Sequence, residues 1–344
     1  MADITGLKEV KSIIAISSCK GGVGKSTVAA LIAQELTQKG LKVGLLDVDM
    51  FGPSIPTLFH TNGPVEVQDN MYIPLESNGL KLMSYGFLVG DEPTVMRGPM
   101  ISRYVSQLVH NTNWGDLDYL FIDFPPGTGD IQLTMTQEIK LDGAIIITTP
   151  QTLSLVDVAR GILMFEKVNI PMLGIVENMA YFQCDNCDKK HYIFGEGSQT
   201  ELEERFGLNV FAQIPLNHTF SNLSGTDPII ANMTNAITES LNTFNLSSFT
   251  SPEVEFNDKE ITLRWTDSNI EVISNKDLRA SCRCAACVDE YTGEVKFDHE
   301  MMRPDIQARN IRTLGNYALS VSWNDGHTSG IYPYKKIKKI SKNL

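Results

Sequence analysis

The six cysteines of this 344-residue chain are grouped in a way that indicates metal chemistry. Cys184 and Cys187 form a C-x-x-C pair, and the stretch from Cys282 to Cys287 carries three thiols at C-x-C-x-x-C spacing, whereas Cys19 stands alone. Thiols this close together in an intracellular chain are more typical of metal or cluster ligands than of disulfides. The sequence therefore predicts two separate thiolate sites.

A glycine-rich segment from Cys19 to Thr27 indicates phosphate binding, because it follows an apolar strand pattern and precedes a helical one. Its backbone N–H groups can surround phosphate oxygens, and the helix N-terminus adds partial positive charge. We expect Lys25 to reach the β- and γ-phosphates and Ser26 to bind Mg²⁺. The predicted ATP-binding residues of this segment are Gly21, Gly22, Val23, Gly24, Lys25, Ser26 and Thr27.

Aspartates end two further predicted strands, with Asp47 and Asp49 after the first and Asp123 at the end of the second. The carboxyl ends of parallel strands face a bound phosphate chain, where Mg²⁺ takes oxygen ligands, often through water. We assign Asp123 to the Mg²⁺ water shell and Asp47 to support of the metal. Asp49 is predicted to orient the attacking water.

The elements that must position these residues alternate along the chain. Apolar runs of strand length are separated by helical patterns such as 26–38 and 154–168, and most runs are apolar on both faces, as buried parallel strands are. The alternation predicts an α/β fold, a doubly wound and mostly parallel sheet with its ligands beyond the carboxyl ends of the strands. The predicted strands are 13–17, 42–47, 119–123, 144–148, 172–177 and 210–214.

The composition changes near residue 246, where Ser, Thr and Pro become frequent. Residues 246–257 are therefore predicted to be a linker. The segment beyond them has the alternating patterns of short antiparallel strands. We divide the chain into a nucleotide-binding domain at 1–245, this linker, and a small, mainly-β, metal-binding domain at 258–344.

The net charge of −12 argues against non-specific nucleic-acid binding, and no apolar run reaches the ~18–20 residues of a membrane span. The N-terminus has no targeting pattern. We therefore expect a cytoplasmic protein with neither a nucleic-acid nor a membrane partner. A basic tail is the exception, since it could contact anionic membrane or RNA instead of being a solvated terminus. Its lysines are Lys335, Lys336, Lys338, Lys339 and Lys342.

Lys20 lies just inside the glycine-rich segment, and Cys19 stands where the general P-loop pattern has its first glycine. This arrangement resembles the deviant Walker loop of the P-loop NTPase class that includes MinD, ParA, the nitrogenase iron protein and the Mrp/ApbC proteins. In that class the early lysine crosses a dimer interface to the partner's nucleotide. The resemblance implies that Lys20 acts catalytically as an arginine finger would, and that Asn178 contacts adenine. An ordinary surface lysine and a loop asparagine are the alternatives.

Several rare strings resemble the Mrp/ApbC group of ATP-dependent iron–sulfur cluster carriers and scaffolds, and the resemblance covers roughly residues 8–240. One thiol pair per chain suggests a shared cluster, since stable ligation usually takes four cysteines. The resemblance implies a [4Fe–4S] cluster that bridges a homodimer through Cys184 and Cys187. It also implies upstream cluster donors and apoprotein clients. A redox C-x-x-C and half of a zinc ribbon are the alternatives. The matching strings are 52–56, 96–100, 123–130, 149–151 and 176–179.

Three thiolates and an imidazole can complete a tetrahedral zinc site in the C-terminal domain. This domain resembles the N-terminal domain of gamma-butyrobetaine hydroxylase, where such a run and a histidine in a W-x-D-G-H string bind zinc. Residues 287–294 also resemble the plastid Mrp-type scaffold that serves photosystem I assembly, which replaces the first two cysteines. A second iron site or free thiols are the alternatives to zinc. The predicted ligands are Cys282, Cys284, Cys287 and His327.

The expected function is that of an iron–sulfur cluster carrier in which slow ATP hydrolysis controls a homodimer. The main alternative is a MinD/ParA-like positioning ATPase, a nucleotide-dependent switch that binds membrane or DNA. An oxygenase fragment, suggested only by the C-terminal resemblance, is disfavoured because the chain has no H-x-D…H set for iron.

Overall fold

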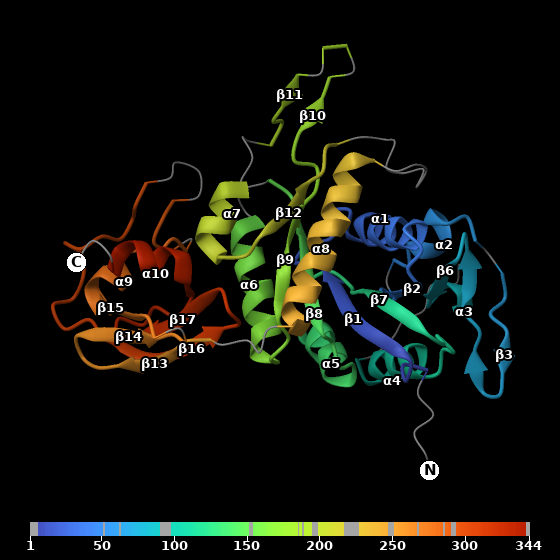
Figure 1. The fold of residues 1–344 in the computed structure, drawn as a ribbon, viewed down its shortest axis with the longest axis horizontal. Helices are drawn as coiled ribbons and strands as arrows, with labels where there is room; N and C mark the ends of the chain where they lie inside the picture. The colour runs from blue at the N-terminus through green and yellow to red at the C-terminus, as the bar shows by residue number, and fades with distance from the viewer. Residues whose placement is uncertain are drawn as a thin grey trace.

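A computed structural model places most of the chain (Figure 1). The residues it describes are 6–50, 52–61, 63–89, 98–150, 154–184, 186–187, 189–194, 199–216, 227–246, 251–266, 268–284, 286–289 and 294–341. Parts of the strings at 96–100 and 149–151 lie outside the described residues, as do most of the first residues of the predicted linker.

An eight-stranded sheet forms the centre of the nucleotide-binding domain, and its neighbouring strands are parallel except at one edge, where β5 pairs antiparallel with β6. This confirms the predicted doubly wound sheet and its six predicted strands, while β5 and β6 extend it beyond the prediction. The order across the sheet is β12 (Val210–Gln213), β9 (Met172–Glu177), β8 (Gly143–Thr148), β1 (Val10–Ser17), β7 (Leu117–Asp123), β2 (Val43–Asp47), β6 (Leu80–Ser84) and β5 (Leu75–Ser77).

Helices cover both faces of this sheet because its central strands are apolar on both sides. Successive residues of β1 alternate between the two cores, with Ile13 in one and Ile14 in the other. The first core lies under α4 (Gly98–His110), α5 (Asp130–Glu138), α6 (Ser154–Lys167) and α7 (Gln199–Phe206), and the second under α1 (Lys25–Gln38) and α8 (Pro228–Leu246).

Short elements complete this domain. Two of them, β10 (Phe182–Gln183) and β11 (Lys190–His191), pair as a hairpin that projects away from the sheet (Figure 1). The others lie near the β5 edge of the sheet or beside the strand ends, and are α2 (Ile55–Leu58), α3 (Gly86–Val89), β3 (Val67–Gln68) and β4 (Met71–Tyr72).

The described part of the C-terminal domain contains two three-stranded antiparallel sheets and two helices around a core of its own. Its first strand, β13, lies inside the segment predicted to be a linker, so the ordered domain begins earlier than expected. The elements are β13 (Glu253–Phe256), β14 (Glu260–Arg264), β15 (Ile270–Ser274), α9 (Asn275–Ala280), β16 (Ala308–Leu314), β17 (Ala318–Trp323), β18 (Gly330–Pro333) and α10 (Tyr334–Ser341).

Much of the basic tail is helix α10, which packs on this domain instead of forming a free solvated terminus. Ile337 of α10 is fully buried, and Lys338 lies over the ring of Trp265 at 4.3 Å from its centroid and pairs with Glu271. Such packing is what an amphipathic helix with one apolar stripe allows. Among the described residues, we find no helix whose length and hydropathy would let it cross a bilayer.

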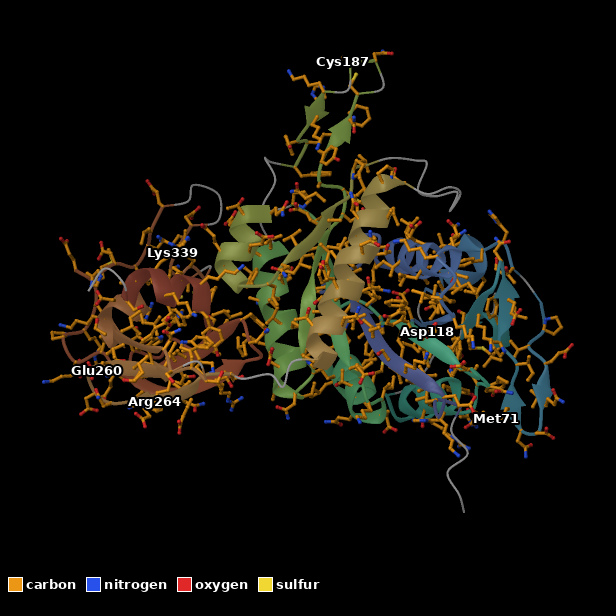
Figure 2. The ribbon with its side chains drawn as sticks, in the orientation of Figure 1. Met71, Asp118, Cys187, Glu260, Arg264 and Lys339 are labelled. Carbon is orange, nitrogen blue, oxygen red and sulfur yellow. The ribbon has the colours of Figure 1, made fainter. Side chains whose placement is uncertain are left out.

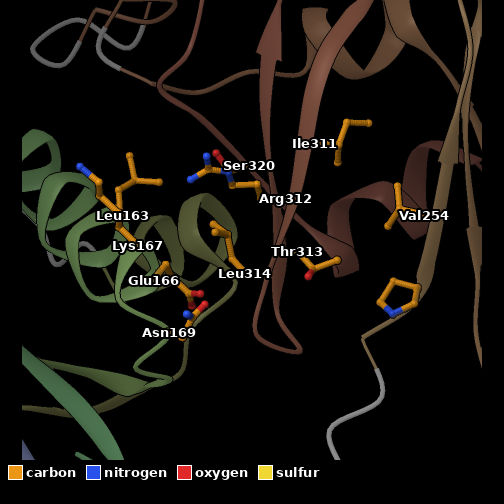
Figure 3. A pocket seen from close by; sticks show the side chains of 11 residues that line it. Leu163, Glu166, Lys167, Asn169, Val254, Ile311, Arg312, Thr313, Leu314 and Ser320 are labelled. Carbon is orange, nitrogen blue, oxygen red and sulfur yellow. The ribbon is translucent and has the colours of Figure 1, made fainter. Parts of the chain in front are cut away.

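The two domains meet at a contact centred on Tyr317, in the turn between β16 and β17. The buried Tyr317 hydroxyl donates a hydrogen bond to Glu166 Oε1 of α6 at 2.6 Å. Leu314 and Ile331 of the C-terminal domain share an apolar core with Phe206 of α7. A cavity of about 470 Å³ lies beside this contact, between α6 and the strands β16 and β17 (Figure 3). The C-terminal domain is therefore packed against the nucleotide-binding domain as well as tethered to it.

Glu166 makes this contact sensitive to pH, because burial raises its pKa to about 7 against the opposing effect of the Tyr317 hydrogen bond. A folded pKa above the ordinary value means that the stabilisation is present at low pH and is lost as pH rises from about 4.5 to about 7. We expect Glu166→Gln to be more stable than wild type by about 1 kcal/mol at pH 5.5 and by about 3 kcal/mol at pH 8. Calorimetric melting at both pH values tests this.

The exposed Glu253 of β13 provides the control, since Glu253→Gln removes a carboxylate of the C-terminal domain without touching the contact of Glu166 with Tyr317. Its melting temperature should follow wild type at both pH values. A Glu166→Gln shift of equal size at pH 5.5 and pH 8 would contradict the assignment of the pH dependence to this carboxyl.

Candidate functional site

The phosphate loop connects β1 to α1 and forms one wall of a cavity of about 510 Å³. Gly22 and Gly24 have φ of 78° and 79°, a left-handed conformation that favours glycine. At Gly24 a side chain is also excluded by space, since a Cβ would lie 2.3 Å from Asn178 Nδ2. The cavity is lined by most of the predicted ATP-binding residues, which are Gly21, Gly22, Gly24, Lys25, Ser26 and Thr27, together with Lys20 and Asp49.

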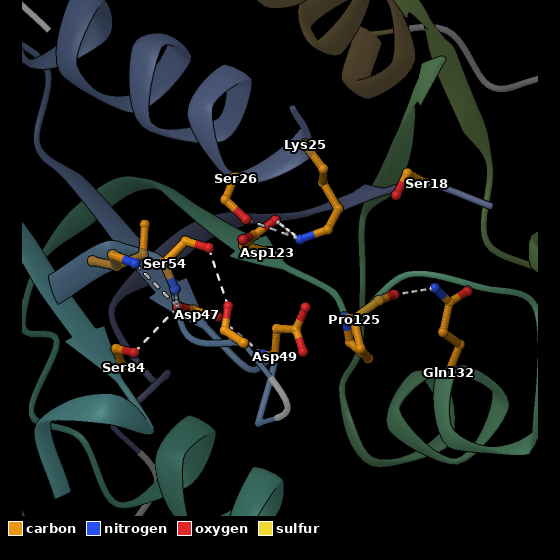
Figure 4. A network of polar contacts seen from close by, with 12 residues as sticks. Ser18, Lys25, Ser26, Asp47, Asp49, Ser54, Ser84, Asp123, Pro125 and Gln132 are labelled. Atoms are coloured by element: carbon orange, nitrogen blue, oxygen red, sulfur yellow. Dashed lines mark hydrogen bonds and ion pairs between the residues drawn. The ribbon is translucent and has the colours of Figure 1, made fainter. Parts of the chain in front are cut away.

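Lys25, Ser26 and Asp123 form the buried centre of this cavity (Figure 4). Lys25 Nζ is ion-paired with Asp123 Oδ1 and lies 3.3 Å from Ser26 Oγ. Burial raises the pKa of Asp123, although Lys25 opposes this. Asp123 Oδ2 is buried without a hydrogen-bond partner in the described part of the chain. A hydroxyl and an orphaned carboxylate oxygen are the donors that a hydrated Mg²⁺ takes, so the residues fit the predicted metal.

Asp47 lies beside this centre, and both of its oxygens already accept hydrogen bonds. Oδ1 accepts from the backbone N–H of Asp49 at 2.9 Å, and Oδ2 accepts from Ser54 N–H at 2.9 Å and from the Ser84 hydroxyl at 3.2 Å (Figure 4). Burial, with the charge of Asp123 nearby, raises the pKa of Asp47 to about 7. The arrangement positions the loop that brings Asp49 to the cavity, so the predicted support of the metal by Asp47 would act through this loop.

Lys20 lies at the mouth of the cavity and is held within its own chain. Its Nζ is 2.8 Å from Asp157 Oδ2, near the start of α6. The neighbouring Cys19 is half-buried, and burial raises the pKa of its thiol to about 12, so this cysteine is a packing residue of the loop. The predicted contact of Lys20 with a partner's nucleotide requires this ion pair to open.

Asn178 follows β9 and lies against the back of the phosphate loop. Its Nδ2 donates to the backbone carbonyl of Val23 at 2.9 Å. The structure therefore brings Asn178 and Val23 together as a support of the loop, and the adenine contact of Asn178 stays a prediction.

Cys184 and Cys187 lie far from this cavity, on the projecting hairpin β10–β11, with the exposed Cys187 at its tip (Figure 2). The backbone N–H of Cys184 donates to the carbonyl of Lys189 at 3.0 Å, which closes the turn. The sequence analysis did not single out the apolar side chains around the pair. Tyr192, Ile193 and Phe194 follow β11 directly and are exposed, and Phe182 of β10 is exposed as well. Three consecutive apolar residues beside a polar hairpin were the sequence signal that could have identified this surface.

The four predicted ligands of the C-terminal domain do converge. One ligand atom from each of Cys282, Cys284, Cys287 and His327 lies within 4.8 Å of all the others. His327 Nε2 is 3.3 Å from the sulfur of Cys282 and 3.5 Å from that of Cys284. A tetrahedral ion with thiolate and imidazole ligands needs ligand-to-ligand distances of roughly 3.4–3.8 Å. One metal ion fits this group, whereas a cubane cluster, which binds each thiolate to a different iron, needs wider spacing.

Local structure explains this convergence. Ser274 caps α9 by accepting a hydrogen bond from the backbone N–H of Asp277 at 3.0 Å, and the three cysteines follow where α9 ends. His327 is presented by the turn between β17 and β18, where its own N–H donates to Asp325 Oδ1 at 2.9 Å. The cysteine run and the histidine, 40 residues or more apart in sequence, are thus held by two ordered elements of one small core.

Each of the two domains matches a known protein family. A family described as NUBPL iron-transfer P-loop NTPase matches residues 9–246, and one described as gamma-butyrobetaine hydroxylase-like, N-terminal, matches residues 253–338. The chain is 39% identical over 354 residues to the chloroplastic Fe-S cluster assembly factor of Arabidopsis thaliana, a match that covers 98% of this chain and 66% of the relative. Because that relative is chloroplastic, the expected cytoplasmic location stays a prediction.

Two further relatives match the nucleotide-binding domain. The iron-sulfur cluster carrier protein of Aquifex aeolicus is 49% identical over 212 residues, which cover 60% of this chain and 58% of the relative. The chain thus spans about two thirds or less of the length of these curated relatives. A nucleotide-binding protein from Archaeoglobus fulgidus, solved with ADP and with cobalt found, is 40% identical with a TM-score of 0.57, covering 68% of this chain and 90% of that one. Since the first family covers more than half of the sequence and the phosphate loop has its expected geometry, the chain belongs to the NUBPL iron-transfer P-loop NTPase family.

Proposed function

We propose that this protein is a nucleotide-controlled iron–sulfur cluster carrier, in which two copies hold one [4Fe–4S] cluster between their hairpins and transfer it to apoproteins. The observation that carries the proposal is the position of Cys187, exposed at the tip of a hairpin that projects from a P-loop NTPase domain (Figure 2). A thiol pair on a projecting element, with Cys187 exposed and Cys184 half-buried, can meet both a second copy and a client. The carrier and assembly names of the relatives support this function.

A homodimer follows from the number of ligands. One hairpin offers two thiolates, stable cluster ligation usually takes four, and a twofold axis supplies the other two from an identical surface. The apolar side chains beside the pair favour the same arrangement, since Ile193 is 59% exposed and Phe194 39% exposed. Exposed apolar groups that cluster at one element indicate a surface covered by a partner. In the dimer they would exclude water from the cluster.

Nucleotide control would act through the phosphate loop. Lys25 and the loop N–H groups would bind the phosphates of ATP, and Ser26 and Asp123 would hold the hydrated metal. Asp49 would orient the water that attacks the γ-phosphorus as the bond to ADP breaks. Bound Mg²⁺ supplies charge stabilisation for this phosphoryl transfer. The side chain of Lys20 is 38% exposed in its ion pair with Asp157, and ion pairs this exposed contribute ~1 kcal/mol or less to stability. Lys20 can therefore leave Asp157 for a partner's phosphates at little cost.

The C-terminal site is proposed to hold one zinc ion. Three sulfurs and one imidazole nitrogen at tetrahedral spacing support this choice, and Zn²⁺ favours such ligand sets in structural sites. The ion would stabilise a domain whose core is small.

Anaerobic reconstitution with iron and sulfide tests the proposed function. We expect about one [4Fe–4S] cluster per dimer, with the absorption and spin-resonance signature of that cluster, and its transfer to an apo aconitase-type acceptor at a rate that changes with MgATP. A chain that takes up no cluster, but co-sediments with anionic vesicles or DNA only when ATP is present, would instead support the positioning ATPase. Packing of α10 on its own domain disfavours that alternative, because Tyr334 and Ile337, the apolar side chains that a membrane-bound α10 would insert, are buried in the domain.

A further inference from the structure

Each sulfur of the C-terminal cysteine group has a hydrogen-bond partner from a different part of the domain. One partner is a buried guanidinium on α9, and the other two are hydroxyls next to or on β18. Thiolates in metal sites are tuned by such donors, and these outer partners matter nearly as much as the ligands. The pairs are Arg279 with Cys287, Ser329 with Cys284, and Tyr332 with Cys282.

Arg279 differs from the other two partners because it also reaches the histidine side of the site. It is 3% exposed, and its Nη1 lies 3.2 Å from Cys287 Sγ. Its Nε donates to Asp325 Oδ2 at 2.9 Å, and Asp325 Oδ1 accepts the backbone N–H of His327 at 2.9 Å. The face of the guanidinium lies 3.8 Å from the ring centroid of Phe297. One side chain thus joins the cysteine run to the turn that presents the imidazole.

The charge of the site gives this cation a second role. Three thiolates, a neutral imidazole and a divalent ion leave one net negative charge in a buried group, and an uncompensated buried charge is costly. Arg279 cancels that charge at contact distance. Further charged groups lie beside the site, since Asp325 pairs with Arg279, Lys336 of α10 donates to the carbonyl of Ser281 at 2.5 Å, and Arg283 stands within the cysteine run.

We infer that Arg279 is a positioning residue of this metal site, which holds Cys287 and the His327 turn at ligand distance and offsets the negative charge that three thiolates leave around a divalent ion. This inference rests on the proposal that the C-terminal site binds metal. Arginine suits the role better than lysine, because its planar fork donates to two acceptors at once and it stacks on an aromatic ring.

Metal titration of the full chain tests the inference. The parent protein carries Cys184→Ser and Cys187→Ser so that only the C-terminal thiols bind, and it is stripped of metal under anaerobic, reducing conditions. Co²⁺ and Zn²⁺ are then titrated against a chromophoric chelator. We expect Arg279→Gln to weaken binding about 10–100-fold and to shift the sulfur-to-cobalt charge-transfer band, because Cys287 loses its donor. Arg279→Lys should recover part of the affinity.

Arg264→Gln is the matched control, since this arginine of the same domain is exposed and pairs with Glu255 on a neighbouring strand. It should leave both affinity and spectrum unchanged. Parent-like affinity and an unshifted band in Arg279→Gln would overturn the inference alone, whereas a parent protein that binds no metal would overturn the zinc proposal with it. If Arg279→Gln unfolds the domain, Asp325→Asn is tested in its place. A several-fold loss of metal affinity would support the link from Arg279 through Asp325 to the His327 turn, and parent-like affinity would refute it.

Discussion

Replacing Cys184 and Cys187 together by serine is expected to abolish the bridging cluster while leaving nucleotide binding intact. Both thiols lie on the hairpin, away from the nucleotide cavity, and serine keeps their size but is a poor iron ligand (Figure 2). Because each dimer would lose all four cluster ligands, we expect cluster content after anaerobic reconstitution to fall to background. Iron and sulfide analysis and the visible absorption of the cluster give the measurement, with nucleotide affinity measured on the same sample.

The chain offers a matched control for this substitution in its other thiol group. Cys284→Ser/Cys287→Ser removes the same number of thiols, but from the C-terminal site, whose three sulfurs surround a single ion position. It should lose the tightly bound zinc and retain the transferable cluster. If the hairpin double variant reconstitutes as much cluster as wild type, the cluster is held elsewhere and the proposed carrier function fails.

Lys20→Ala is expected to lower ATP hydrolysis about a thousandfold while the affinity for MgATP changes little. The structure places Lys20 at the mouth of the cavity and Lys25 at its buried centre, so removing Lys20 leaves the phosphate-binding groups in place. Lys25→Ala should instead lose nucleotide binding itself. Single-turnover hydrolysis and equilibrium binding of a fluorescent ATP analogue separate the two effects.

Mixing these two variants shows in which chain Lys20 acts. A heterodimer of Lys20→Ala with Lys25→Ala has one intact phosphate site, on the Lys20→Ala chain, and the other chain still carries Lys20. If Lys20 acts on the partner's nucleotide, the mixture recovers part of the wild-type rate, up to roughly a quarter for random pairing. A mixture as inactive as its components would show that Lys20 acts within its own chain. Asp157→Asn, which frees Lys20 from its ion pair, should hydrolyse ATP at least as fast as wild type.

Local patterns were sufficient to predict the nucleotide-binding domain. Buried parallel strands are apolar on both faces, so segments such as Met172–Glu177 were recognisable without knowledge of their neighbours. The phosphate loop could be predicted in the same way, because its glycines, Lys25 and Ser26 lie between a strand pattern and a helix pattern. The convergence of Cys282, Cys284, Cys287 and His327 was also predictable, because their residue types and spacing are typical of a tetrahedral site.

Features that depend on which segments meet could not be predicted. Strand β6 carries a lysine and a serine and is only five residues long, and it is a strand because β2 lies beside it. Strand β13 lies in a Ser- and Pro-rich stretch and is stabilised by pairing with β14. The contacts of Lys20 with Asp157 and of Glu166 with Tyr317 join residues 137 and 151 positions apart, a separation over which periodicity carries no information.

Helix α6 takes part in both of those contacts. Asp157 holds the phosphate loop and Glu166 holds the C-terminal domain, and the nine positions between them are two and a half helical turns, about 13 Å along the axis. Asp157 and Glu166 therefore point to opposite sides of one stiff helix, and each makes a contact with a different part of the protein. If a partner's nucleotide draws Lys20 away from Asp157, α6 would lose its contact with the phosphate loop and would keep its contact with Tyr317. The angle of α6 would then change, and the C-terminal domain, which is bonded to α6 through Tyr317 and Glu166, would move with it.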